Sequence, residues 1–125
     1  MAKTSVALLG YGNIARGAEI ALSGMADMEL TAVFTRRDPA GVKLRTPGVP
    51  VIAAEEAENW RDRVDVLILC GGSATDLPVQ GPKYAELFNT VDSFDTHAKI
   101  PAYRRAMEAA AGKSGHLSVI SCGWE

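Results

Sequence analysis

Hydrophobic residues in this chain gather in short, continuous runs that are separated by glycine-rich turns and helical patterns. The first run covers residues 6–9 and ends at Gly10, and the second covers residues 30–35. Uninterrupted apolar runs are typical of strands that are covered on both faces, as in a parallel sheet. Between the two runs, small and apolar residues recur at the spacing of one helix face: Ile14, Gly17, Ala18, Ala21 and Leu22. The pattern predicts a strand–helix–strand unit, with Gly24 as the stop signal of the helix.

The rest of the chain continues the alternation of strands and helices. Further strands are predicted at residues 51–52, 64–69, 89–91 and 117–121, and helices at 54–60, 81–88 and 101–111. Residues 38–50 contain three prolines and two glycines, which is typical of a surface connection within one domain. Because alternating strands and helices form right-handed crossovers, we expect a doubly wound α/β domain with a mostly parallel sheet and helices on both faces.

Composition narrows the class of protein. The chain has 125 residues, 47% of them hydrophobic and 22% charged, which fits one globular domain. A net charge of −2 gives no basic surface for nucleic acid or membrane. No apolar run approaches the ~20 residues that span a bilayer, and residues 6–9 are too short for a secretory signal. Cys70 and Cys122 lack neighbours at metal-ligand spacing, so we predict buried thiols in a cytoplasmic protein without a metal site.

The segment Gly10-Tyr11-Gly12-Asn13-Ile14-Ala15 has the G-x-G-x-x-A form of a dinucleotide-binding turn. It follows a predicted strand and opens a predicted helix, which is the context that the motif requires. Gly10 allows the tight turn, Gly12 lets the backbone approach a pyrophosphate, and Ala15 lets the helix pack close to the strand. The helix N-terminus then offers free N–H groups to the anion. A glycine turn that serves packing only is the alternative.

Two arginines follow the second predicted strand, at the position that selects the cofactor. An NAD-binding domain usually has Asp or Glu there to bind the ribose hydroxyls, whereas this chain has Thr35-Arg36-Arg37. An arginine fork can bind the 2′-phosphate of NADP with paired, charged hydrogen bonds. The sequence therefore predicts a preference for NADP, provided that these are not merely solvated surface arginines. Asp38 comes next, but the loop can turn it outward.

Two further segments end predicted strands at the same edge of the sheet. Cys70-Gly71-Gly72-Ser73 could let a dinucleotide lie close to the backbone, or could be a plain turn. The second segment carries Asp92 and Asp95, whose carboxylates could hold a cationic amine or could cap the next helix. His97, at its end, fits a loop or capping residue better than a base.

Beyond these features, the chain resembles the meso-diaminopimelate dehydrogenase family across nearly its whole length. The matching stretches are residues 6–13, 34–37, 72–76, 90–95 and 121–124. The glycine motif is generic, but the other stretches are particular to the family and occur in the same order at similar spacing. The resemblance implies a Rossmann-type fold and an NADP-dependent oxidative deamination of meso-2,6-diaminopimelate at its D-centre, giving L-2-amino-6-oxopimelate and ammonia.

The resemblance also implies roles for particular residues. It implies NADP contacts at Tyr11, Gly12, Asn13, Ile14, Thr35, Arg36, Arg37, Cys70, Gly71, Gly72, Ser73, Ser93, Phe94 and Asp95. Asp95, Trp124 and Glu125 would face the D-amino-acid end of the substrate, with Asp95 holding the ammonium group. Glu125 replaces the usual aspartate of the family, and a carboxylate displaced by about 1 Å can slow a reaction ~100-fold.

The family has a second domain, which supplies dimerisation and the grip on the distal L-centre of the substrate. We therefore expect a homodimer for the whole family protein and no activity from these 125 residues by themselves. Two other functions remain open on sequence grounds. One is another NADP oxidoreductase on the same domain, such as a sugar or dihydrodipicolinate-type enzyme. The other is a module that senses NADP(H) without catalysis.

Overall fold

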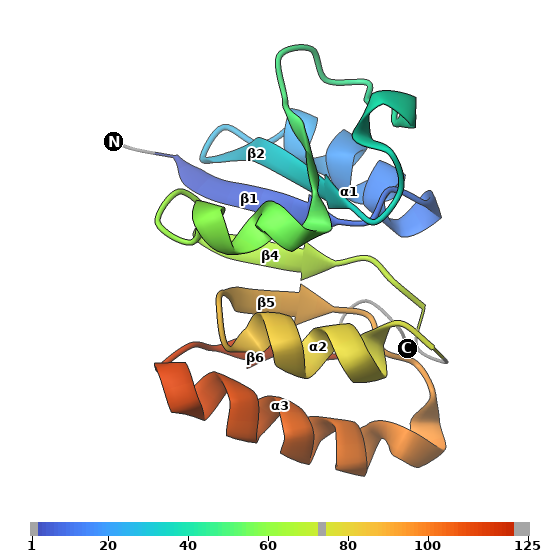
Figure 1. Cartoon of the computed structure of the whole chain (residues 1–125), viewed down its shortest axis with the longest axis vertical. Coiled ribbons are helices and arrows are strands. Elements are labelled where there is room, and N and C mark those ends of the chain that lie inside the picture. The colour runs from blue at the N-terminus through green and yellow to red at the C-terminus, as the bar shows by residue number, and fades with distance from the viewer. Residues whose placement is uncertain (1–2, 73–74, 122–125) are drawn as a thin grey trace.

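The computed structural model describes residues 3–72 and 75–121 and contains one six-stranded sheet (Figure 1). Its strands are β1 (Thr4–Leu9), β2 (Met28–Thr35), β3 (Val51–Ala53), β4 (Val66–Leu69), β5 (Asn89–Asp92) and β6 (Ser118–Val119). They lie in the order β3-β2-β1-β4-β5-β6, and each neighbouring pair is parallel. This is the strand order of the Rossmann fold, in which the winding reverses between β1 and β4. The predicted fold class is confirmed.

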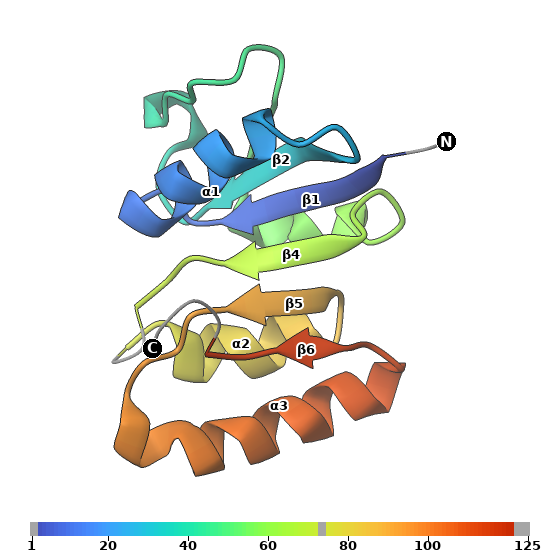
Figure 2. The same ribbon diagram turned by 180° about the vertical axis from the view of Figure 1, so that it is seen from behind.

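Helices cover both faces of the sheet. The α-helices are α1 (Asn13–Ser23), α2 (Leu77–Ala85) and α3 (Ile100–Ser114), and the 3₁₀ helices are η1 (Pro39–Gly41), η2 (Ala54–Trp60) and η3 (His97–Lys99). Helix α1 covers one face, whereas η2 and α2 cover the other, as the opposite views of Figures 1 and 2 show. Among the described residues, no helix is long and apolar enough to cross a membrane.

Two hydrophobic clusters hold these layers together, and β1 contributes to both. Ala7 and Leu9 pack into the larger cluster, which includes buried residues of η2, α2 and α3. Leu8, on the opposite face of the strand, packs into the smaller cluster beside Ala15 of α1. The alternation follows from the two-residue period of a strand. It explains why residues 6–9 are continuously apolar.

Several predicted element bounds were wrong for local reasons. Helix α2 begins four residues earlier than residue 81, because Pro78 occupies its first turn, where no N–H is needed. Helix α3 continues past residue 111 to Ser114, and the next residue, Gly115, caps it in the left-handed conformation with a φ of +72°. By contrast, the helix predicted at residues 54–60 is confirmed with the same bounds, in the 3₁₀ form. Strand β4 begins at Val66, and β6 is shorter than predicted, at the edge of the sheet.

The predicted inner face of α1 was wrong in part, although the buried Leu22 and the partly buried Ala18 belong to it as predicted. Its buried residues are Ala15, Glu19 and Leu22, whereas Ile14 is 46% exposed. The true face is rotated by about one residue from the predicted one. The error arose because Glu19 reads as a solvent-facing residue, although hydrogen bonds satisfy its carboxylate inside the protein.

Candidate functional site

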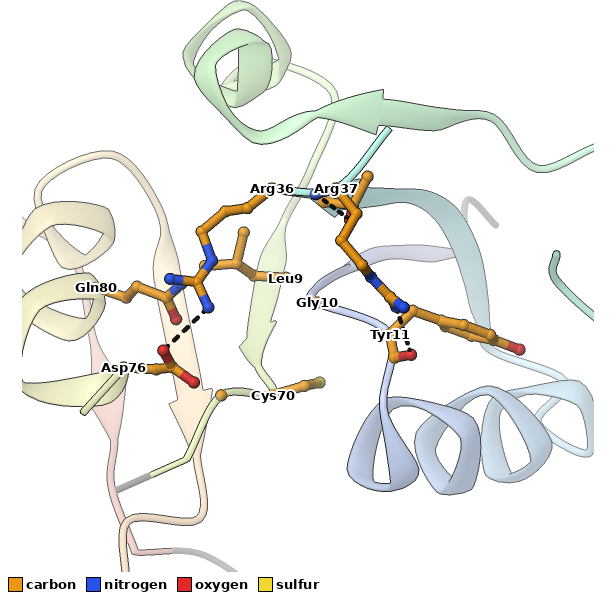
Figure 3. Close-up of a pocket in the computed structure, with 10 residues that line it drawn as sticks. Leu9, Gly10, Tyr11, Arg36, Arg37, Cys70, Asp76 and Gln80 are labelled. Carbon is orange, nitrogen blue, oxygen red and sulfur yellow. Dashed lines mark hydrogen bonds and ion pairs between the residues drawn. The ribbon is translucent and has the colours of Figure 1, made fainter. Parts of the chain in front are cut away.

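A pocket of about 240 Å³ opens at the carboxyl ends of β1, β2 and β4, beside the point where the winding reverses. Open α/β sheets bind ligands at this edge. The pocket is lined by Leu9, Gly10, Tyr11, Thr35, Arg36, Arg37, Cys70, Gly71, Asp76 and Gln80. Figure 3 shows that three segments far apart in the sequence meet there. The structure thus brings the glycine turn, the arginine pair and the turn after β4 to one place.

The glycine turn between β1 and α1 has the conformation that the motif requires. Gly10 has a φ of +92°, a region that favours glycine, and its N–H donates to the carbonyl of Phe34 over 2.8 Å. Gly12 is extended, at φ −108°, and precedes the first residue of α1. A Cβ built on Gly12 meets no protein atom within 4 Å. Glycine at this position therefore leaves open space in front of the helix N-terminus, and that space fits the approach of an anionic group.

A buried polar network fixes Tyr11, the residue between the two glycines. Its hydroxyl donates to Oε1 of Glu19, which is 2% exposed. Oε2 of Glu19 accepts from the N–H of Thr46 over 2.8 Å and from its Oγ1 over 2.7 Å. Burial opposes ionisation of Glu19, but the hydrogen bonds from Tyr11 and Thr46 outweigh it, so the pKa of Glu19 lies below its usual value. The network joins the glycine turn, α1 and the loop before β3.

The two arginines after β2 point in different directions (Figure 3). Nη2 of Arg36 lies 2.9 Å from Oδ1 of Asp76, across the pocket. Nη2 of Arg37 donates instead to the backbone carbonyl of Tyr11 over 3.1 Å. Asp38 is exposed, and its carboxylate accepts from the N–H of Ala40, which caps η1. The acidic residue next to the arginines is therefore engaged in its own turn.

The turn after β4 forms the opposite wall of the pocket. Cys70, predicted to be a buried thiol, is partly buried, and this burial raises the pKa of its thiol to about 12. Gly71 lies so close to α2 that an added Cβ would be 2.6 Å from Cβ of Asp76. Asp76 accepts from the N–H of Gly72 over 3.1 Å. That hydrogen bond and the neighbouring Arg36 guanidinium hold the pKa of Asp76 below its usual value, although burial opposes them.

Sequence reasoning assigned no role to two residues of this wall, Asp76 and Gln80. Asp76 belongs to the stretch 72–76 that carried the family resemblance, and this was the available signal. Gln80 lies one turn further along α2, where its Oε1 is buried with no hydrogen-bond partner among the described residues. An unpaired amide oxygen that lines a pocket could accept a hydrogen bond from a ligand.

The predicted contacts after β5 do not line this pocket. Phe94 is 1% exposed, and its ring stacks on Tyr103 with centroids 4.1 Å apart, so its side chain belongs to the core. Asp92 is buried and accepts from the hydroxyl of Tyr103 over 2.5 Å. Its other oxygen accepts from the N–H of Phe94 over 2.9 Å and from that of Ser121 over 3.0 Å. Asp92 therefore joins two segments, 93–95 and 121, and does not cap a helix.

Some of the remaining predicted site residues lie outside this pocket, and others lie outside the described residues. Asn13 and Ile14 form the exposed first turn of α1, and Ser93 and the exposed Asp95 follow β5. His97 begins η3. Ser73, Cys122, Trp124 and Glu125 lie outside the described residues. Within the part of the chain that is described, no group of three or more His, Cys, Asp or Glu residues could hold a metal ion.

The features of the pocket fit an anionic dinucleotide. The space at Gly12 admits a group close to the backbone, and the N-terminus of α1 has a glycine rather than a capping side chain before it. Arg36 and Arg37 supply two positive charges on the pocket wall, against the one negative charge of Asp76. The pocket gathers many of the predicted residues, but their roles in binding a cofactor remain predictions.

The chain was compared with family models, with curated proteins and with solved structures. No family model matches the chain. A meso-diaminopimelate D-dehydrogenase from Lysinibacillus sphaericus is 57% identical over all 125 residues, which span 38% of that relative. A crystal structure of an engineered D-amino acid dehydrogenase bound to NADP⁺ matches with a TM-score of 0.89 and 41% identity, over 98% of this chain and 37% of that one. The C. glutamicum DAP dehydrogenase in complex with DAP also matches, with a TM-score of 0.89 and 41% identity over 99% and 37% of the two chains.

Proposed function

Because this chain is homologous along its whole length to part of the meso-diaminopimelate D-dehydrogenases, we propose that it is the NADP-binding part of such an enzyme. The observation that carries the proposal is the pocket at the ends of β1, β2 and β4, where an open glycine turn faces two arginines. The chain spans 38% of the length of its relative, so the activity proposed is that of a longer protein.

In this proposal the cofactor lies across the carboxyl edge of the sheet. Backbone N–H groups at the start of α1 bind the pyrophosphate, and the side chains after β2 bind the adenosine end with its 2′-phosphate. When bound, NADP⁺ supplies the hydride acceptor for oxidation of the substrate. The relative crystallised with NADP⁺ supports the choice of cofactor.

The proposed substrate is meso-2,6-diaminopimelate. Its D-configured carbon would give up a hydride and its ammonium group a proton, leaving an iminium ion. Water would then add to this carbon, and ammonium would leave to give L-2-amino-6-oxopimelate. The neighbour crystallised with DAP supports this substrate class. Asp95 would hold the ammonium group, with Trp124 and Glu125 close to the same carbon. Asp92 would support this end of the site, because its hydrogen bonds fix the segments that lead to these residues. The cytoplasmic location and the homodimer also remain proposals.

The cofactor proposal can be tested on the chain itself by calorimetric titration with NADP⁺ and, separately, with NAD⁺. We expect saturable binding with a clear preference for NADP⁺. The double substitution Arg36→Ala/Arg37→Ala should remove the preference by lowering affinity for NADP⁺ more than for NAD⁺. A folded chain that binds neither nucleotide would contradict the proposal. Equal binding of both would leave the glycine motif standing but would contradict the role of the arginines.

A further inference from the structure

The electrostatic surroundings of Arg36 and Arg37 are different, although the two residues are adjacent in the sequence. Arg36 faces a carboxylate 2.9 Å away, so its positive charge already has a counter-charge inside the protein. Arg37 faces a neutral backbone carbonyl, that of Tyr11, over 3.1 Å. A carbonyl orients a guanidinium group but does not cancel its charge. The two arginines therefore offer unequal attraction to an incoming phosphate.

The carboxylate opposite Arg36 is itself held in place. Oδ2 of Asp76 accepts from the N–H of Gly72, and only a glycine at position 71 leaves room for its Cβ. The side chain of Asp76 is 27% exposed, against 66% for Arg36, so the acid is the more fixed member of the pair. The pair joins the end of β2 to the start of α2 across the pocket (Figure 3).

The partner of Arg37 is also held in place, by a charged group that lies behind the glycine turn rather than in the pocket. The ring of Tyr11 is 6% exposed, and its hydroxyl is bound to Glu19 on the far side of the turn. This anchorage fixes the backbone carbonyl that accepts from Arg37. The N–H of Arg37 also donates to Oγ1 of Thr35 over 3.0 Å, which fixes the backbone at the base of its side chain. Arg37 is therefore oriented beside the glycine turn with its charge uncompensated by its described partner.

Resting on the proposed function, we propose that Arg37 is the residue that selects the 2′-phosphate of NADP. Arg36, in contrast, is held by its ion pair with Asp76 across the adenosine end of the pocket and contributes little to that selection. Asp76 is a specificity-determining residue in this arrangement, because its negative charge offsets Arg36 and repels the phosphate. The chain keeps its preference for NADP through one uncompensated arginine.

Three substitutions, each made singly, test this division: Arg37→Gln, Arg36→Gln and Asp76→Asn. The readout is the ratio of the Kd for NAD⁺ to that for NADP⁺, measured by calorimetry on the full 125-residue chain. Arg37→Gln should lower this ratio by about tenfold or more, as expected for the loss of a charged hydrogen bond. Arg36→Gln should lower it by about threefold or less, since an exposed, compensated pair contributes little.

Asp76→Asn gives the sharpest result, because asparagine has nearly the same shape but no charge. Its single amide oxygen can keep the hydrogen bond from the N–H of Gly72, whereas its NH₂ group replaces the oxygen that accepts from Arg36. The substitution should raise affinity for NADP⁺ about threefold and leave affinity for NAD⁺ unchanged, which a purely structural role would not do. The exposed pair Arg104–Glu108 on α3 does not line the pocket and supplies matched controls. Arg104→Gln and Glu108→Gln make the same charge changes and should not alter either Kd.

Different outcomes contradict different statements. A loss from Arg36→Gln as large as that from Arg37→Gln, or a weaker binding of NADP⁺ by folded Asp76→Asn, would overturn the division between the arginines and leave the proposed function intact. A folded wild-type chain that binds neither nucleotide would overturn both. Circular dichroism melting of each variant identifies any loss of affinity that arises from unfolding.

Discussion

The turns that follow β1 and β4 form opposite walls of one pocket, and both contain glycine, but their glycines meet different surroundings. A Cβ on Gly12 would meet nothing within 4 Å, whereas a Cβ on Gly71 would lie 2.6 Å from Cβ of Asp76 and 2.9 Å from Oε1 of Gln80. The first turn is open on the side where a ligand would lie, and the second is closed against its own helix. Glycine at a strand end can therefore serve either a ligand or the fold, and the sequence does not say which.

The two turns are also supported in different ways. Buried side chains behind the pocket hold the first turn, through the hydrogen bonds of Glu19 to Tyr11 and Thr46. Close backbone packing holds the second, through the contact of Gly71 with Asp76. We therefore expect a substitution to affect stability at Glu19 and at Gly71, and to affect binding without stability at Gly12.

The largest loss of stability should come from Glu19→Ala. The substitution leaves the hydroxyl of Tyr11 and the N–H of Thr46 without their acceptor, and leaving such buried groups unpaired costs about 2–4 kcal/mol in total. Urea denaturation monitored by circular dichroism measures the change. An unchanged midpoint would show that the network does not support the turn.

The lowered pKa of Glu19 also predicts how the stability of the protein depends on pH, and Glu19→Gln is the control for this prediction. Because folding lowers the pKa of Glu19, its contribution to stability is present above its ordinary value of 4.5 and is lost as the pH falls through the lower folded value. The wild type should therefore lose more stability than Glu19→Gln between neutral pH and acid. Parallel pH profiles of the two proteins would contradict the assignment.

An intermediate effect is expected from Gly71→Ala. The new Cβ overlaps Cβ of Asp76, and overpacking of this kind costs about 1–3 kcal/mol. Gly72→Ala is the matched control, because a Cβ there would be 4.0 Å from Oδ2 of Asp76, which is ordinary contact. Chemical denaturation of both variants should show a loss at position 71 and a smaller one at position 72. The reverse order would contradict the account of the second turn.

Gly12→Ala should have the smallest effect on stability, within about 0.5 kcal/mol, because its Cβ meets no protein atom. It should nevertheless weaken NADP⁺ binding about tenfold, since the methyl group occupies the space proposed for the pyrophosphate. Gly17→Ala on α1 is the matched control, because its Cβ also meets nothing and a helix interior favours alanine. Melting curves and calorimetric titrations of the two variants measure these effects. Binding of NADP⁺ by both variants with wild-type affinity would contradict the role proposed for Gly12.

Features local in the sequence were predictable, and contacts between distant segments were not. The strand runs and the glycine motif identified the fold class and the turn at Gly10, because both depend on neighbouring residues. The partner of Arg36 could not be foreseen, because Asp76 is 40 residues away and no local pattern reports that contact. Part of the inner face of α1 was missed for a related reason: the acceptors and donors that allow Glu19 to be buried come from other segments.

The family resemblance indicated segments of the proposed site but could not show which of their atoms are accessible to a ligand. The resemblance to meso-diaminopimelate dehydrogenases is confirmed over the whole chain, and it drew attention to residues 93–95. It did not show that the ring of Phe94 packs into the core, which leaves only its backbone for a cofactor contact. A family motif identifies a segment, whereas packing decides which atoms of that segment remain available.

The central claim, that NADP binds in the pocket between these two turns, is tested most directly by NMR. Amide chemical shifts of the ¹⁵N-labelled chain would be followed during titration with NADP⁺. The account predicts that the largest changes fall on Gly10 to Ile14, on Arg36 and Arg37, and on Gly71, with little change along α3. Changes that concentrate on α3 and β6, or a folded chain with no changes at saturating NADP⁺, would contradict it.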